Sequence, residues 1–245
     1  MKIYDNDNLI RTLKKKSPDK KGIYKIQWYM DEKGPNYPRR KIRKNNNEGS
    51  GVQVKPGTYK LIMQVGEIKD ESSIIIKPDP RLKFSKKTIE DSYNSGKKLE
   101  NFIETVNQVS NQLAESIIIV KDFEKIMAKD TSTHKKHLKL SKEMIKKITG
   151  IQDLFFGKDD KRQGIIRSPK ENVLSRIRKA SYYASSRPNG ITKTENILIN
   201  QAKNELESAL DSVNSFFIDD WKDYQLKMEE IDFSPFKSIK NFSLK

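Results

Sequence analysis

Apolar residues recur at spacings of three and four over most of the chain beyond residue 85, and this spacing predicts amphipathic helices. The longest stripe covers residues 86–127 and includes Tyr93 and Gly96. One helix of that length would span roughly 60 Å at about 1.5 Å per residue, so other helices must cover its apolar side. Ser85 is placed to cap its first turn. Residues 133–155 repeat the spacing and predict a second helix.

Two further helices are predicted towards the end of the chain. Ser168-Pro169 is typical of a helix start, and Pro188-Asn189-Gly190 would end that third helix. Thr192 or Thr194 would begin the fourth, whose apolar stripe includes Trp221. Two long helices beside two shorter ones predict an antiparallel bundle over residues 85–231. An oligomeric coiled coil is the alternative, but the breaks between the stripes favour one chain that folds back on itself.

Residues 1–82 alternate between apolar and polar positions with a period of two, which predicts strands. The segment 22–30, GIYKIQWYM, is one expected strand, with Trp28 as its largest core residue. Residues 58–65 and 72–77 predict a hairpin closed by residues 66–71. Pro78 ends the second strand because proline cannot donate to a ladder. Five or six short strands predict a small β-sandwich of the immunoglobulin or fibronectin kind.

Two segments lack this patterning. Residues 31–50 are rich in Gly, Pro, Asn and charge, and they predict a long, exposed and mobile loop. Residues 232–245 are predicted to form an extended tail. The expected division is therefore a β-sandwich over residues 1–82, a helical bundle over 85–231 and the tail.

The first third of the chain also carries a resemblance to a known family. A glycine-led strand with Trp28, then V-x-PGTYKL at 54–61 and KPDPRL at 77–82, is similar to the C-terminal region of bacterial sortilin-like proteins with BNR repeats. Here Tyr29 and Met30 follow the tryptophan, where the family commonly has an aspartate. The resemblance implies a FlgD-like immunoglobulin domain and then a helical region. In that family both follow a large exported β-propeller, which would hold any catalytic or ligand site.

Charge suggests a second class of partner. The formal net charge is +16, and charged residues make up 33% of the chain against 34% that are hydrophobic. A basic patch attracts nucleic acid, anionic lipid or an acidic partner, although lysine that serves only solubility is the more ordinary interpretation. The candidate contact residues are Lys14, Lys15, Lys16, Lys20, Lys21, Arg39, Arg40, Lys41, Arg43 and Lys44.

Catalytic chemistry finds little support in the sequence. The chain has no cysteine, which excludes thiolate nucleophiles and thiolate zinc sites. His134 and His137 could share a metal, but the lysines around them favour surface histidines. The Ser-x-x-Lys matches at Ser95–Lys98 and Ser234–Lys237 lack the partner motifs of serine acyl enzymes. The adjacent carboxylates, interpreted as a solvated face, are Asp159, Asp160, Asp219, Asp220, Asp223, Glu229 and Glu230.

Aromatic residues complete the search for a site. Trp28, Trp221 and the Tyr182-Tyr183 pair could stack on sugars or bases, while packing is the preferred interpretation. The sequence therefore predicts a non-catalytic structural or interaction module, with no catalytic residue, cofactor or metal. Its expected partner is an upstream β-propeller of the same polypeptide or another protein, and its expected location is outside the cytoplasm. The alternative is a binder of nucleic acid or an acidic polysaccharide.

Overall fold

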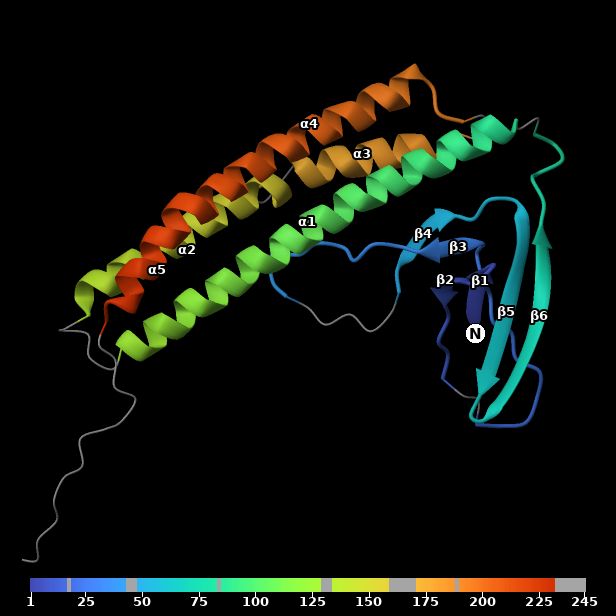
Figure 1. Ribbon diagram of the computed structural model, residues 1–245, viewed down its shortest axis with the longest axis horizontal. Helices are drawn as coiled ribbons and strands as arrows, with labels where there is room; N and C mark the ends of the chain where they lie inside the picture. Colours follow the sequence, from blue (N-terminus) through green and yellow to red (C-terminus); the bar gives the residue numbers. More distant parts are fainter. Residues whose placement is uncertain are drawn as a thin grey trace, which may run out of the picture.

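The computed structural model describes residues 1–16, 19–42, 48–82, 85–128, 134–158, 171–187 and 190–231. A β region lies beside the first half of a long helix, and three helical segments cover another side of that helix (Figure 1). The strands are β1 (Lys2–Asp5), β2 (Asn8–Thr12), β3 (Asp31–Lys33), β4 (Ser50–Gln53), β5 (Gly57–Val65) and β6 (Ile68–Ile76). The helices are α1 (Lys86–Met127), α2 (Lys135–Phe156), α3 (Val173–Ser185), α4 (Lys193–Phe216), the π-helical turn η1 (Phe217–Trp221) and α5 (Lys222–Glu229). The predicted fold class, a small N-terminal β-sandwich followed by an antiparallel helical bundle, is confirmed as antiparallel β-sheets followed by such a bundle, while the immunoglobulin kind of the sandwich stays a prediction.

The strands form two antiparallel sheets. One has four strands in the order β2-β1-β5-β6, and the other pairs β3 with β4. Asn6 and Gly66 occupy the tight turns of the two hairpins, with φ of 52° and 60°. Asparagine and glycine tolerate this left-handed geometry at little cost, which explains their place in two-residue turns. The small core of the region consists of the buried Ile3, Val54 and Tyr59.

The β5–β6 hairpin differs in one respect from the prediction. Its turn contains only Gly66 and Glu67, because Val65 pairs directly with Ile68. β6 therefore begins four residues earlier than the expected strand at Ser72. Residues 69–71 are charged, so the sequence does not show the alternation expected of a strand at the start of β6. The strand tolerates these charges because the hairpin is exposed and their side chains lie in water.

The expected strand at residues 22–30 is wrong, because residues 23–29 belong to no strand. Ile23 is fully exposed, and the Tyr24 hydroxyl donates to the carbonyl of Lys20 at 2.5 Å. Trp28 does pack as expected, with its ring 5.8 Å from that of Tyr59. Its indole N–H also donates to the Asp31 carbonyl at 2.8 Å. Trp28 therefore anchors residues 22–30, which pair with no neighbouring strand despite their alternating pattern.

The interpretation of residues 31–50 as a mobile loop is wrong at the start of the segment and near its middle. Asp31–Lys33 forms β3, which pairs with β4. Further along, Arg40 lies against the end of α2, where it forms an ion pair with Asp153 at 2.8 Å. The guanidinium also lies 5.3 Å from the centre of the Phe156 ring. This segment therefore connects the sheets to the bundle, while residues 43–47 lie outside the described part of the chain.

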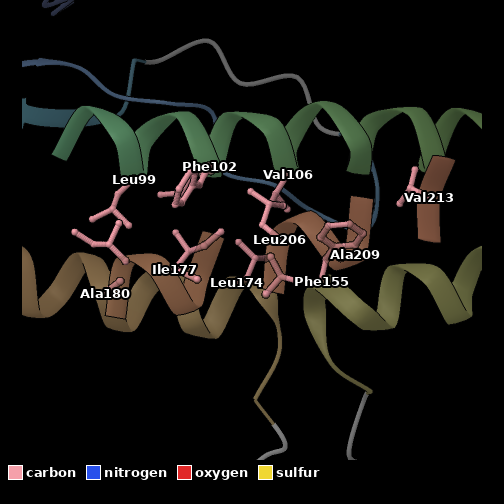
Figure 2. Packing of buried hydrophobic residues seen from close by; sticks show 14 residues of the cluster. Leu99, Phe102, Val106, Phe155, Leu174, Ile177, Ala180, Leu206, Ala209 and Val213 are labelled. Atoms are coloured by element: carbon pink, nitrogen blue, oxygen red, sulfur yellow. The ribbon is translucent and has the colours of Figure 1, made fainter. Parts of the chain in front are cut away.

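The bundle follows the predicted arrangement of two long and two shorter helical segments. α2 and α3 lie one after the other along α1, and α4 continues through η1 into α5 across them (Figure 1). Leu99, Phe102 and Val106 of α1 point towards side chains of α2 and α3 (Figure 2). The fully buried Phe155 of α2 belongs to the same core cluster. The burial of these stripes is the dominant stabilising contribution to the bundle.

The helix starts agree with the sequence at three of four positions. Ser85 caps α1 by accepting from the Thr88 N–H at 3.0 Å, and Thr192 caps α4. α2 begins within two residues of its predicted start. α3 begins only at Val173, where Asn172 forms a capping box with Ser175. The predicted start at Ser168-Pro169 lies outside the described residues.

Glu195 completes the capping box of α4 and gives a prediction about acid stability. Its side chain is 0% exposed, accepts from the Thr192 N–H at 2.9 Å and pairs with Arg187 at 3.1 Å. The hydrogen bond from the Thr192 hydroxyl is the main cause that lowers the pKa of Glu195 below its ordinary 4.5. A lowered pKa stabilises the fold above pH 4.5, and that contribution is lost as the pH falls through the folded-state value.

We therefore expect Glu195→Gln to be less stable than the parent at neutral pH, with the difference shrinking as the solution becomes acidic. Urea unfolding at a series of pH values measures this. Glu207→Gln is the matched control, because Glu207 is exposed on the same helix and, in the described part of the chain, forms an ion pair only with Lys203. A constant difference between Glu195→Gln and the parent from neutral to acid pH would contradict the assignment.

Candidate functional site

A cleft of about 600 Å³ lies where β4 approaches α1 and the end of α3. Its lining combines apolar side chains with hydroxyl groups, two tyrosines, two cations and the carboxylate of Glu100. The lining residues are Pro35, Tyr37, Ser50, Gly51, Val52, Gln53, Val54, Lys55, Thr88, Ile89, Ser92, Tyr93, Gly96, Leu99, Glu100, Ile103, Ser181, Ala184, Ser185 and Arg187. The cleft therefore marks the junction between the β region and the bundle.

The close approach of β4 to α1 depends on a helical glycine. A Cβ atom at position 96 would lie 2.5 Å from Cγ1 of Val52, well inside normal contact distance. Gly96 therefore lets the strand lie directly on the helix backbone. The sequence places this glycine on the apolar stripe of α1, where a larger residue would ordinarily be expected.

Four side chains form a polar network beside this contact, here called the junction network: Glu32, Tyr93, Lys97 and Glu100. Glu32 of β3 accepts from the Tyr93 hydroxyl at 2.7 Å and from Lys97 at 3.1 Å. Lys97 also pairs with Glu100 at 2.9 Å. Glu100 in turn accepts from the backbone N–H of Val52 at 2.6 Å. The network thus joins both strands of the small sheet to two turns of α1.

The network shifts the protonation equilibria of its members. Burial and the hydrogen bond to Glu32 raise the pKa of Tyr93 to about 12. Burial alone would lower the pKa of Lys97, but its hydrogen bonds to Glu100 and Glu32 outweigh that effect and raise it. Both shifts favour the state with a neutral phenol and a charged ammonium group.

Tyr93 therefore gives a prediction about alkaline stability. A raised pKa stabilises the fold below the unfolded value of 10.0, and this contribution is lost as the pH rises towards about 12. We expect Tyr93→Phe to lower the free energy of unfolding at neutral pH. We also expect this free energy to decrease less steeply between those two pH values than it does in the parent. Urea unfolding across that range measures the effect. Tyr182→Phe, at a site that is 69% exposed, is the control and should leave the profile unchanged. If the stability of Tyr93→Phe fell as steeply with rising pH as that of the parent, the assignment would be contradicted.

A second polar contact joins the two sheets to each other. Arg11 of β2 and Asp31 of β3 are both buried and lie 3.4 Å apart. Arg11 also donates to the carbonyls of Glu32, at 3.2 Å, and of Gly49. A buried ion pair is stable only when further hydrogen bonds satisfy its groups, and these two carbonyls do so for Arg11. Because both the ion pair and one of these bonds reach β3, Arg11 fixes the position of that strand and of Glu32 within it.

The basic residues singled out in the sequence do not all remain available for a partner. Arg40 is engaged with Asp153 and the Gly157 carbonyl, so it serves the fold. Arg43 and Lys44 lie outside the described residues. The side chains that remain exposed are Lys14, Lys15, Lys16, Lys20, Lys21, Arg39 and Lys41.

The candidate catalytic groups do not converge. His134 and His137 lie 6.2 Å apart between ring centres, and the described residues contain no group of three potential metal ligands. Lys98 lies over the Phe102 ring, with its Nζ 5.9 Å from the ring centre. Asp220 pairs with Lys147, and Asp223 pairs with Lys227. Asp159, Asp160, Ser234 and Lys237 lie outside the described residues.

The aromatic candidates divide into packed and exposed residues. Trp28 and Trp221 are half-buried and pack against the cores of the β region and the bundle, as expected. Tyr182 and Tyr183 are 69% and 40% exposed, so they do not pack in the core of this chain, and their packing against another domain stays a prediction. They lie on α3, and their rings form an edge-on pair at 5.7 Å.

The junction network was missed in the sequence. In the sequence, Tyr93 belongs to the apolar stripe, and Glu32, Lys97 and Glu100 resemble ordinary surface charges. The one available signal was the pair of small and aromatic residues at positions 96 and 93, one turn apart on a stripe of larger side chains.

Comparison of the chain with family models, with curated proteins and with solved structures found no match. Among the described residues, no helix is both long enough and apolar enough to cross a membrane.

Proposed function

We propose that this chain is a non-catalytic structural and interaction module, the C-terminal part of an exported sortilin-like β-propeller protein. The observation that carries the proposal is the junction, where Gly96 and the junction network attach the β region to α1. A module attached in this way presents its β surface to a neighbour in one orientation. Its partner is the upstream propeller or another protein.

The Asp79-Pro80-Arg81 segment supports this proposal from a second direction. Arg81 donates to the Asp79 carboxylate through its backbone N–H at 3.0 Å and through Nη2 at 2.6 Å. The Leu82 N–H donates to the Asp79 carbonyl at 3.1 Å. These contacts close a turn in the segment that follows β6. The Asp79-Pro80-Arg81 motif, on which the family resemblance partly rests, therefore helps to direct the chain towards α1.

The first test is the reading frame upstream of Met1, which should encode a propeller. The propeller and this chain are then expressed as separate polypeptides and mixed. We expect a complex in size-exclusion chromatography, and no turnover of chromogenic glycosides by this chain alone. An upstream frame without a propeller, or turnover that survives repurification, would contradict the proposal.

Polyanion binding is the second candidate, because seven of the ten candidate basic residues are exposed in the described chain. Titration with DNA and with an acidic polysaccharide at two salt concentrations tests it. Affinity that persists near physiological salt would favour it over the first proposal. Affinity that disappears there would leave only generic charge attraction.

A further inference from the structure

The β5–β6 hairpin carries an apolar face that begins in the core and continues into solvent. Directly paired residues share a face of a sheet, so Tyr59 and Leu61 lie on the same side as Ile74. Near β1 this side is covered, and Tyr59 is 4% exposed. Further along it is uncovered: Ile74, Met63, Val65 and Ile68 are 39%, 40%, 55% and 78% exposed, and Ser72 and Asp70 lie between Ile74 and Ile68 on the same side of β6. The exposed stretch therefore extends the packed face of the same sheet.

The outer edge of β6 is also open. β6 is the last strand of its sheet, and among the described residues it pairs only with β5, without a bulge, over its nine residues. Natural sheet edges are ordinarily protected by proline, bulges or charged side chains. β6 contains no proline, and its last five residues, Ser72–Ile76, carry no charge. Such an edge accepts a further strand.

We propose that β6 and the exposed apolar face beside it form a docking surface for an extended segment of a partner polypeptide, added as a fifth strand. The partner's backbone pairs with β6, and its alternate apolar side chains extend the face formed by Met63, Val65, Ile68 and Ile74. This rests on the proposed function, for which it names the contact surface.

Charge defines the chemistry of the partner. The hairpin is electrically balanced: Lys60, Lys69 and Lys77 stand against Glu67, Asp70 and Glu71. Lys60 and Glu71 pair with each other at 2.9 Å on the opposite face. A balanced surface beside an uncharged strand end fits a segment of low net charge whose alternate side chains are apolar opposite Ile68 and Ile74 and polar opposite Asp70.

A second copy of this chain fits the surface less well. The antiparallel register that pairs all nine residues of two β6 strands is centred on Ser72, and it places Lys69 opposite Ile75 and Asp70 opposite Ile74. Charged residues would thus face isoleucines across the interface. Each copy also carries a net charge of +16, so the two repel.

The test uses the whole chain and a phage-displayed library of random dodecapeptides. We expect enriched peptides to alternate apolar and polar residues and to slow amide hydrogen exchange in β6. Their affinity should fall by about tenfold or more in Ile68→Lys and Ile74→Lys. Ile68 is the safer of the two sites for folding, because Ile74 lies opposite the buried Tyr59.

Ile75→Lys is the matched control, because Ile75 lies on the same strand but on the opposite face and is 66% exposed. It should change peptide affinity by less than about threefold. The proposal is overturned by a library without such enrichment, by peptides that bind Ile68→Lys as well as the parent, or by a dimer in sedimentation that Ile68→Lys abolishes. If the peptide experiment fails while the complex with the propeller still forms, only the docking proposal is contradicted. Turnover of glycosides would contradict only the proposed function.

Discussion

Replacing Phe155 with alanine should lower the free energy of unfolding by about 3–5 kcal/mol. Phe155 is fully buried in the core that α1, α2, α3 and α4 share, and Figure 2 shows it beside Leu174. Truncation removes a whole ring and leaves a cavity that helices from several directions cannot all close at once. Urea unfolding followed by circular dichroism measures the loss.

The neighbouring residue provides the control for Phe155. Leu154 is 42% exposed, so Leu154→Ala should cost less than about 1 kcal/mol. Equal losses of unfolding free energy at the two positions would contradict the burial of Phe155 in this core.

Gly96→Ala should destabilise the protein by about 1–3 kcal/mol, although such a change in a helix interior ordinarily stabilises by about 0.5–1 kcal/mol. The reason is steric, since the new methyl group would lie 2.5 Å from Cγ1 of Val52. Its effect should therefore reach the junction network and speed hydrogen exchange in β3 and β4. Urea unfolding and hydrogen exchange measure the two effects.

Two further variants make the Gly96 prediction specific. Val52→Ala removes the clashing methyl group, so the double variant should recover most of the stability lost in Gly96→Ala. Gly150→Ala in α2 is the matched control, because apart from its own turn of helix no atom of the described residues lies within 4 Å of the new Cβ there. It should show the ordinary stabilisation. Stabilisation of similar size in Gly96→Ala and Gly150→Ala would contradict the close contact between β4 and α1.

The helical half of the molecule could be predicted well from local signals. The bounds of α1 coincide with the predicted stripe at residues 86–127, because Ser85 caps one end and the apolar spacing continues without interruption to the other. Thr192 likewise identified the start of α4. Regular spacing and capping residues are local properties, so a single sequence displays them.

The β half was less predictable because its outcome depends on distant partners. The alternation at residues 22–30 resembles that of β5, but only β5 lies between two neighbouring strands, β1 and β6. Similarly, the composition of residues 31–50 indicates a loop, and nothing local reveals that Arg40 pairs with Asp153, more than a hundred positions away. Local pattern cannot show which edge or helix a segment will meet.

The junction, unlike the helices, could not be predicted from the sequence. The interpretation of His134, His137 and the adjacent carboxylates as surface residues stays a prediction. The junction network could not be found from residue types and spacing alone, because Glu32 lies over 60 positions from Tyr93 and Lys97. Its members acquire a role only when β3 lies on α1.

Differential scanning calorimetry of the whole chain measures whether the junction makes the β region and the bundle one cooperative unit. We expect a single transition whose calorimetric and van't Hoff enthalpies agree, and we expect that entire transition to move to lower temperature in Phe155→Ala. Two separate transitions, of which Phe155→Ala shifts only one, would contradict this expectation.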